Sequence, residues 1–219
     1  MAVPRLAVLA SGAGTNLQAL IDAIVSGELS ARIVGVFSDK PASPAMQRAV
    51  EAGVPATALS PKAFASRAAF DAALFAAIDA AQPDLIVCAG YMRLISAAEV
   101  EARPDRMINL HPSLLPAFKG LHTHQQALDA GVLEHGASVH VVTADLDGGP
   151  VIARARVPVL PGDSAETLAA RVREQEHPLL VETVRLLGEG RLRLGGGRIC
   201  LNDRALEAPL QLGANRQLA

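Results

Sequence analysis

Short apolar runs alternate with segments of helical spacing through the first half of the chain. The runs that fit buried strands lie at residues 6–10, 33–37, 56–59, 85–89 and 107–111, because a strand covered on both faces has no polar side. The segments with apolar residues at helical intervals lie between them, at residues 17–25, 44–52, 64–81 and 96–101. This alternation predicts an α/β fold, in which a doubly wound, mostly parallel sheet carries helices on both faces.

The pattern changes after Pro116. A helix is expected at residues 123–130, and two segments with better alternation follow at residues 137–143 and 151–157. We interpret these two segments as antiparallel strands, which give the fold an antiparallel C-terminal part. The connection between them, at residues 145–150, has the length and position of a functional loop.

The longest helical pattern covers residues 164–187. Ser164 and Glu166 suit its N-terminus. Ser164 followed by Thr167 does not match a capping box, because that motif has Glu or Gln at the third position after the cap. Pro178 should kink this helix, since proline removes a backbone hydrogen bond from the helix interior.

The end of the chain contains short apolar segments and a turn signal. We expect two or three short strands in residues 195–219, with a hairpin turn at Asn202 and Asp203. The whole length of 219 residues suits one large domain. We therefore assign residues 1–194 to the main domain and treat the tail as part of the same domain.

Composition argues against a nucleic-acid or membrane partner. Aromatic residues make up 3% of the chain, Trp is absent and the formal net charge is −2, so neither stacking platforms nor a basic surface is expected. No apolar run is long enough to cross a bilayer, and the first residues do not resemble a signal peptide. Cys88 and Cys200 lie far apart in apolar surroundings, which is typical of reduced thiols. We expect a cytoplasmic protein with small-molecule partners, either a monomer or a homodimer.

The turn at residues 11–16 joins the first predicted strand to the first predicted helix. Gly12 and Gly14 leave several backbone N–H groups accessible at a helix N-terminus, where such groups attract phosphate or carboxylate. The stretch lacks the third glycine of a dinucleotide fingerprint and the Gly-Lys-Ser/Thr of a nucleoside-triphosphate loop. Phosphate binding and plain helix initiation are both open for this turn.

Asn109 and His111 lie two residues apart on the strand predicted at 107–111, which puts both side chains on one face. Pro112 ends this strand where α/β sheets usually carry their chemistry. An amide can donate to a developing oxyanion and an imidazole can exchange a proton near neutral pH, although a turn Asn and a core His would look the same. Asp147 on its glycine-backed loop favours chemistry, because a carboxylate near His111 would fix the tautomer of the ring.

Other polar positions fit more than one interpretation. His122 and His124 resemble a metal-binding pair, but no third ligand has suitable spacing, so capping or substrate contact is favoured over zinc. The loop at residues 91–95 follows a strand and is either a wall of the site or a plain connection. Arg67 on its Ala-rich helix would ordinarily be a solvated charge, and Glu176 faces either a substrate or water.

Five stretches of the chain, in this order, resemble the phosphoribosylglycinamide formyltransferases, a family of folate-dependent enzymes of purine biosynthesis. They are the glycine turn, a strand end, the strand with Asn and His, a His-rich loop and the Asp loop, at residues 11–18, 89–94, 109–116, 120–124 and 146–150. The resemblance extends over residues 5–194, so the main domain is expected to be a formyltransferase domain. It implies formyl transfer from 10-formyltetrahydrofolate, a co-substrate, to the amine of phosphoribosylglycinamide, with no metal.

The resemblance also implies roles for individual residues. Asn109, His111 and Asp147 match the catalytic residues of the family. The positions that match its contacts to the substrate phosphate and the glycinamide are Gly14, Thr15, Asn16 and Glu176. The positions that match its folate contacts are Arg67, Met92, Arg93, Leu94, Ile95 and Asn109. Many members have Ser at the position of Thr15, and the hydroxyl is kept.

Three other functions compete with this one. A hydrolase that releases formate from formyltetrahydrofolate resembles this chain through the same Asn, His and Asp, but it usually has an N-terminal regulatory domain and has no need of a phosphate turn. Methionyl-tRNA formyltransferase would need a larger RNA-binding region and a basic surface, which a chain of 219 residues with a charge of −2 does not fit. A non-catalytic nucleotide-binding module would have no use for a His111–Asp147 pair.

Overall fold

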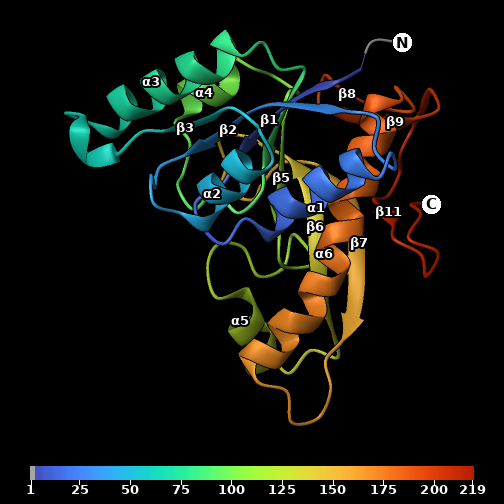
Figure 1. Ribbon diagram of the computed structural model, residues 1–219. Coiled ribbons are helices and arrows are strands. Elements are labelled where there is room, and N and C mark those ends of the chain that lie inside the picture. Colours follow the sequence, from blue (N-terminus) through green and yellow to red (C-terminus); the bar gives the residue numbers. More distant parts are fainter. Residues whose placement is uncertain (1–2) are drawn as a thin grey trace. The chain divides into compact units, whose positions relative to one another are not determined.

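The computed structural model describes residues 3–219 (Figure 1). The chain forms two compact units, one up to Asn109 and one from Leu110 onward. Strand β5 (Met107–His111) carries the chain from the first unit into the second. Within residues 3–219, no helix is both long enough and apolar enough to cross a membrane.

The first unit is a parallel sheet with helices on both faces. Its strands are β1 (Arg5–Leu9), β2 (Arg32–Ser38), β3 (Ala56–Ala58), β4 (Leu85–Cys88) and β5. They lie in the order β3-β2-β1-β4-β5, and each neighbouring pair is parallel. The helices are α1 (Thr15–Val25), α2 (Pro44–Glu51), α3 (Arg67–Ala80) and α4 (Ala97–Glu101), with a short 3₁₀ helix η1 (Pro61–Ala63). Figure 1 shows α1 beside α2 on one side of these strands and α3 beside α4 on the other.

The central strands of this sheet are apolar on both faces because helices cover both. All four residues of β4 and the last four of β1 are buried, as expected for parallel strands. The α/β class predicted from the hydrophobic pattern is therefore confirmed. Helix α3 begins at Arg67 and not at residue 64, because the Ser66 hydroxyl caps it by accepting a hydrogen bond from the Ala69 N–H at 3.1 Å.

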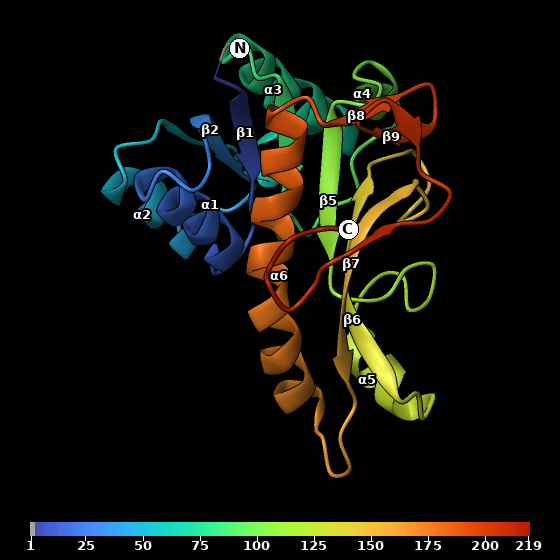
Figure 2. The ribbon, with the colours of Figure 1, turned by 90° about the vertical axis from the view of Figure 1, so that its right-hand side faces the viewer.

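The second unit holds the antiparallel part that the alternating segments predicted. Its helices are α5 (Thr123–Asp129) and α6 (Ala165–Gly188), and its long strands are β6 (Glu134–Val141) and β7 (Val151–Pro158). The strands β6 and β7 pair in antiparallel fashion, β11 (Leu210–Gln211) joins β7 in parallel, and α6 packs along β6 and β7 (Figure 2). A separate antiparallel sheet consists of β8 (Leu192–Gly195), β9 (Arg198–Leu201) and β10 (Arg204–Ala205).

The start of α6 corrects one prediction. Ser164 and Thr167 do form a capping box: the Ser164 hydroxyl accepts from the Thr167 N–H at 3.2 Å, and the Thr167 hydroxyl accepts from the Ser164 N–H at 2.9 Å. The prediction was wrong because a threonine hydroxyl, although shorter than a glutamate side chain, reaches the capping N–H here. Helix α6 runs through Pro178 without interruption.

The hairpin turn predicted in the tail is confirmed. Asn202 and Asp203 link the antiparallel strands β9 and β10, with φ angles of 49° and 65°. Two consecutive residues in the left-handed region are what a two-residue hairpin turn of the favoured twist requires. Asn and Asp tolerate this conformation better than most other residues.

Candidate active site

Strand β5 ends in the polar pair that the sequence predicted. Asn109 and His111 are separated by one residue on this strand, so both side chains lie on the same face. Asn109 is half-buried, whereas His111 is only 5% exposed. A histidine buried to this degree needs hydrogen-bond partners.

The partners of His111 are a carboxylate and a carbonyl. Its Nδ1 lies 3.4 Å from Oδ2 of Asp147, and its Nε2 lies 3.0 Å from the carbonyl oxygen of Phe118. Both groups are acceptors, so an imidazolium can donate to both at once. The expected contact between His111 and Asp147 is confirmed, and it places an imidazole beside a carboxylate at the end of a strand.

A second histidine contacts the same carboxylate. His140 on β6 is 3% exposed, and its Nε2 lies 3.6 Å from Oδ1 of Asp147, while its Nδ1 lies 2.9 Å from the carbonyl oxygen of Val141. The Gly120 N–H donates to Oδ2 of Asp147 at 2.9 Å. Asp147 is therefore held from three sides, by two imidazoles and one backbone amide.

The protonation of Asp147 follows from these contacts. Burial would raise the pKa of this carboxyl group, but hydrogen bonds from His140 and Gly120, with the charge of both imidazoles, lower it below its usual range. Asp147 is therefore a carboxylate at neutral pH, and it faces Nδ1 of His111. We did not predict a role for His140 from the sequence. His140 lies near the end of β6, the strand that leads into the Asp147 loop, but the sequence does not show that its ring faces Asp147.

The glycines after Asp147 set the position of its loop. Asp147 itself has a φ of 45°, and a Cβ atom on Gly149 would lie 1.9 Å from the carbonyl oxygen of Val141. No side chain fits in that space, so the backbone of the loop can pass close to the end of β6 only with glycine here. This close approach holds Asp147 between the two histidines.

The predicted phosphate turn lies between β1 and α1 in the first unit. Gly14 is the N-cap of α1 with φ 70°, and no side chain caps the helix there. A Cβ atom on Gly14 would lie 2.7 Å from Cα of Ala45. Thr15 and Asn16 are the first residues of the helix. The cap residue Gly14 has no side chain that could accept from the first amides of α1, and a helix start of this kind can bind an anion.

The predicted folate loop, residues 92–95, is held at both ends by buried polar groups. The Met92 N–H donates to the Ser11 hydroxyl at 3.0 Å, and the N–H of Ser96 donates to Oδ2 of Asp71 at 2.9 Å. Between these anchors, Met92 is 64% exposed and Leu94 is 52% exposed. A loop with a fixed backbone and exposed apolar side chains is suited to an aromatic ligand.

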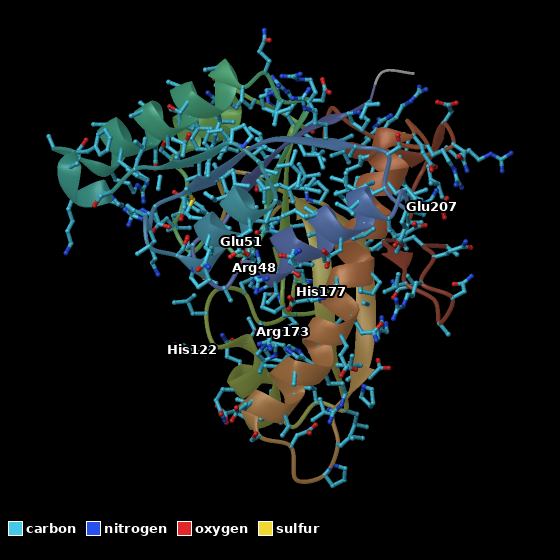
Figure 3. All side chains as sticks on the ribbon, viewed as in Figure 1. Arg48, Glu51, His122, Arg173, His177 and Glu207 are labelled. Carbon is cyan, nitrogen blue, oxygen red and sulfur yellow. The ribbon has the colours of Figure 1, made fainter. Side chains whose placement is uncertain are left out.

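The other predicted positions have simpler surroundings. Arg67 is exposed at the first turn of α3, and Arg93 stacks over the ring of Phe70 with 5.2 Å between guanidinium carbon and ring centroid. Ile95 is half-buried in the folate loop. Glu176 is half-buried on α6, in the stretch where Figure 3 labels Arg173 and His177.

The histidines near α5 form a hydrogen-bonded pair. Nδ1 of His124 lies 3.1 Å from Nε2 of His135. Burial is the largest cause that lowers the pKa of His135 to about 4, and His124 lowers it further. His122 occupies the N-cap position of α5 with φ 58°, but its side chain makes no capping hydrogen bond, so the side-chain capping favoured from the sequence is not what the structure has. Within residues 3–219, no cluster of three or more His, Cys, Asp or Glu side chains could hold a metal ion.

Comparison with known proteins identifies the class of enzyme to which this fold and site correspond. The family model described as formyl transferase matches residues 4–184, most of the chain. The chain therefore belongs to the formyl transferase family.

Individual relatives lie within the same class. A phosphoribosylglycinamide formyltransferase of Escherichia coli is 47% identical over 190 residues, which cover 87% of this chain and 90% of the relative. The solved structure of a phosphoribosylglycinamide formyltransferase from Coxiella burnetii, 43% identical, superimposes with a TM-score of 0.90 and covers 94% of this chain and 96% of its own. A formyltetrahydrofolate deformylase from Burkholderia mallei is 31% identical with a TM-score of 0.82, and the match covers 91% of this chain and 70% of the deformylase.

Proposed function

We propose that this chain transfers the formyl group of 10-formyltetrahydrofolate to the amine of phosphoribosylglycinamide, giving the formylated product and tetrahydrofolate in purine biosynthesis. The observation that supports this most is the buried contact between His111 and Asp147, 3.4 Å apart, at the end of β5. A plain core histidine has no need of a carboxylate held by two further donors. Relatives above 40% identity that carry the name of this activity support the same conclusion.

The proposed chemistry is acyl transfer. The amine attacks the formyl carbon, and a tetrahedral intermediate with a negatively charged oxygen forms. The Asn109 amide and the His111 imidazolium donate hydrogen bonds to that oxygen, a contribution of roughly 3 to 4 kcal/mol for one such donor. Asp147 faces the positive charge of that imidazolium and helps to organise the proton transfer from the attacking amine to the leaving nitrogen. The formyl group is already activated by the folate, so these residues act without a metal in this scheme.

Substrate binding is assigned to the glycine turn and to α6. We propose that the N–H groups at Gly14, Thr15 and Asn16 bind the phosphate of phosphoribosylglycinamide. Glu176 contacts the glycinamide part, where a carboxylate can orient an amine. The glycine at the N-cap, with its positive φ and its close contact to α2, supports this assignment of the turn.

Folate binding is assigned to α3 and to the loop after β4. We propose that Arg67 binds a carboxylate of the folate and that Asn109 contacts its formyl group. The loop positions that line the pterin are Met92, Arg93, Leu94 and Ile95. The backbone anchors at both ends of this loop support the assignment, because a fixed backbone presents its N–H and C=O groups in a constant geometry.

The remaining proposals concern the chain as a whole. We propose that residues 1–194 form the formyltransferase domain and that the tail 195–219 belongs to the same domain. The protein acts on small molecules in the cytoplasm, as a monomer or homodimer, without nucleic-acid or membrane partners.

Hydrolysis of formyltetrahydrofolate is the second candidate function. It is favoured by the similarity to a formyltetrahydrofolate deformylase at 31% identity. A hydrolase would use the same Asn109, His111 and Asp147, with water in place of the amine. It would have no use for a helix start that is arranged to bind phosphate.

An absorbance assay of 10-formyltetrahydrofolate distinguishes the two. We expect loss of the formyl group only when phosphoribosylglycinamide is present, with the formylated product formed in equal amount. Asp147→Asn and His111→Ala should each fold normally and lose at least about a thousandfold in kcat. Release of formate in the absence of phosphoribosylglycinamide would establish the hydrolase instead, and unfolding of His111→Ala would make His111 a structural core residue.

A further inference from the structure

Helix α2 contacts both the glycine turn and helix α1. Nε of Arg48 donates to the carbonyl oxygen of Ala13 at 2.9 Å, and its Nη1 donates to Oε1 of Gln18 on α1 at 3.0 Å. One residue earlier in the turn, the carbonyl of Gly12 accepts a hydrogen bond from the Ala45 N–H at 3.2 Å. Figure 3 labels Arg48 on α2, and Figure 1 shows this helix beside α1.

These contacts fix the direction of two consecutive peptide groups. In a trans peptide the C=O and the following N–H point in opposite directions. The Gly12 carbonyl is directed at Ala45, so the Ala13 N–H points away from α2. The Ala13 carbonyl is directed at Arg48, so the Gly14 N–H points away from α2 as well. Within residues 3–219, neither of these N–H groups donates to another backbone group.

Two N–H groups that point the same way, next to the N-terminus of a helix, form a concave donor site for an anion. The affinity of such a site depends on a fixed orientation of its N–H groups, because part of the binding free energy is lost when the amides must be reoriented on binding. Of the two peptide anchors, the one on Gly12 comes from backbone and the one on Ala13 comes from a side chain. The second anchor is therefore the one that a substitution can remove.

We propose that Arg48 is a positioning residue for substrate phosphate. It orients the Gly14 N–H by holding the carbonyl of Ala13 and ties the turn to α1 through Gln18. This inference rests on the proposed function, which assigns the turn to the phosphate of phosphoribosylglycinamide. The role needs a fork of donors at a fixed angle, which arginine has and lysine lacks.

The test compares Arg48→Met, Arg48→Lys and the control Gln47→Met. Gln47 is the preceding residue on α2; its side chain is exposed, and its amide donates to Oε1 of Glu51 on the same helix at 2.8 Å. We expect Arg48→Met to raise the KM for phosphoribosylglycinamide about tenfold, with kcat and the KM for the folate within about twofold of wild type. Inorganic phosphate should compete correspondingly less well against the variant. Arg48→Lys should fall between Arg48→Met and wild type, and Gln47→Met should match wild type.

Each outcome separates the inference from the function on which it rests. If wild-type protein binds neither phosphoribosylglycinamide nor inorganic phosphate, the proposed function is wrong. If wild type binds them and Arg48→Met binds them equally well, only the positioning role is wrong. If Arg48→Lys binds phosphoribosylglycinamide as well as wild type, Arg48 acts through its charge and not by positioning the turn. If Gln47→Met loses as much affinity as Arg48→Met, the loss comes from a less stable α2. Thermal unfolding of all variants shows whether Arg48→Met is folded. If Arg48→Met is unfolded, the comparison of Arg48→Lys with wild type tests the positioning role.

Discussion

At the scale of single residues, the unexpected feature is the second imidazole, that of His140, which contacts the Asp147 carboxylate. His140 contributes to the lowered pKa of that carboxyl group, so its removal should bring the pKa back up. A carboxylate with a higher pKa becomes protonated at a higher pH. In His140→Phe, the loss of activity on the acid side should therefore begin at a higher pH, with kcat about tenfold lower at neutral pH.

His140→Gln is the matched control, because its amide keeps a donor near Oδ1 of Asp147. We expect its pH–rate profile to lie close to that of the wild type. If the activity of His140→Phe falls at the same acid pH as that of the wild type, His140 has no role in the ionisation of Asp147. The same sign holds for stability: a depressed carboxyl pKa stabilises the fold at pH values above the unfolded-state pKa, and that contribution disappears as the pH falls through the folded-state pKa.

Gly149 permits a second prediction at this scale. A Cβ atom there would lie 1.9 Å from a backbone oxygen, whereas a Cβ atom on Gly195 has no neighbour within 4 Å. Gly149→Ala should lower the free energy of unfolding by about 1 to 3 kcal/mol and reduce kcat through displacement of Asp147. Gly195→Ala should change neither by a measurable amount. Denaturant unfolding and steady-state kinetics of both variants test this, and normal activity in Gly149→Ala would show that the loop adapts.

Gly14 separates crowding from backbone strain. Gly14 and Gly53 have nearly equal φ angles, 70° and 67°, but only at Gly14 would an added Cβ atom meet a backbone neighbour, Cα of Ala45, at 2.7 Å. Gly14→Ala should weaken binding of phosphoribosylglycinamide at least about tenfold. Gly53→Ala should lose only about 1 kcal/mol of stability. Calorimetric titration of both variants with phosphoribosylglycinamide measures the two affinities. Unchanged affinity in Gly14→Ala would show that the turn does not bind the substrate.

At the scale of elements, the capping box of α6 is the feature with a measurable energy. Ser164→Ala removes the side-chain acceptor of the Thr167 N–H and should cost about 1 kcal/mol of stability. Ser96 provides the control, because it is the N-cap of α4 but its side chain makes no capping hydrogen bond. Ser96→Ala should therefore cost distinctly less. Equal losses in urea unfolding would mean that the hydrogen bonds at Ser164 contribute little.

At the scale of the whole molecule, the tail is tied to the rest of the second unit. Strand β9 pairs with β8, β11 pairs with β7, and Leu210 and Ile199 are buried. A chain ending at residue 194 loses these contacts, so its melting temperature should fall by several degrees, roughly 4 °C for each kcal/mol lost. Because none of the proposed catalytic and binding residues lies in the tail, the KM values should stay within about twofold. A full loss of activity at a temperature where the shortened chain is folded would assign the tail a role in the site.

The hydrophobic pattern predicts most of the fold, because parallel strands covered on both faces leave continuous apolar runs in the sequence. The pattern does not predict details that a short-range hydrogen bond determines. Examples are the start of α3, which Ser66 caps, and the capping box of α6, which Thr167 completes. The contact between His111 and Asp147 could be predicted from residue types and motif order. The part played by His140 could not, because nothing in a linear sequence states that a strand histidine faces a loop that follows it along the chain.

The two-residue strand β11 has a consequence for solubility. It hydrogen-bonds to β7 at Ala153 and Arg154, and the N–H of Leu212 donates to the carbonyl of Arg154 at 2.8 Å. It thereby occupies backbone groups that an open strand edge would offer to a second chain. Without the tail these groups are free to pair with another molecule, and exposed strand edges are common starting points for aggregation. Strand β11 therefore covers a part of the β7 edge that would otherwise be open to pairing with another chain.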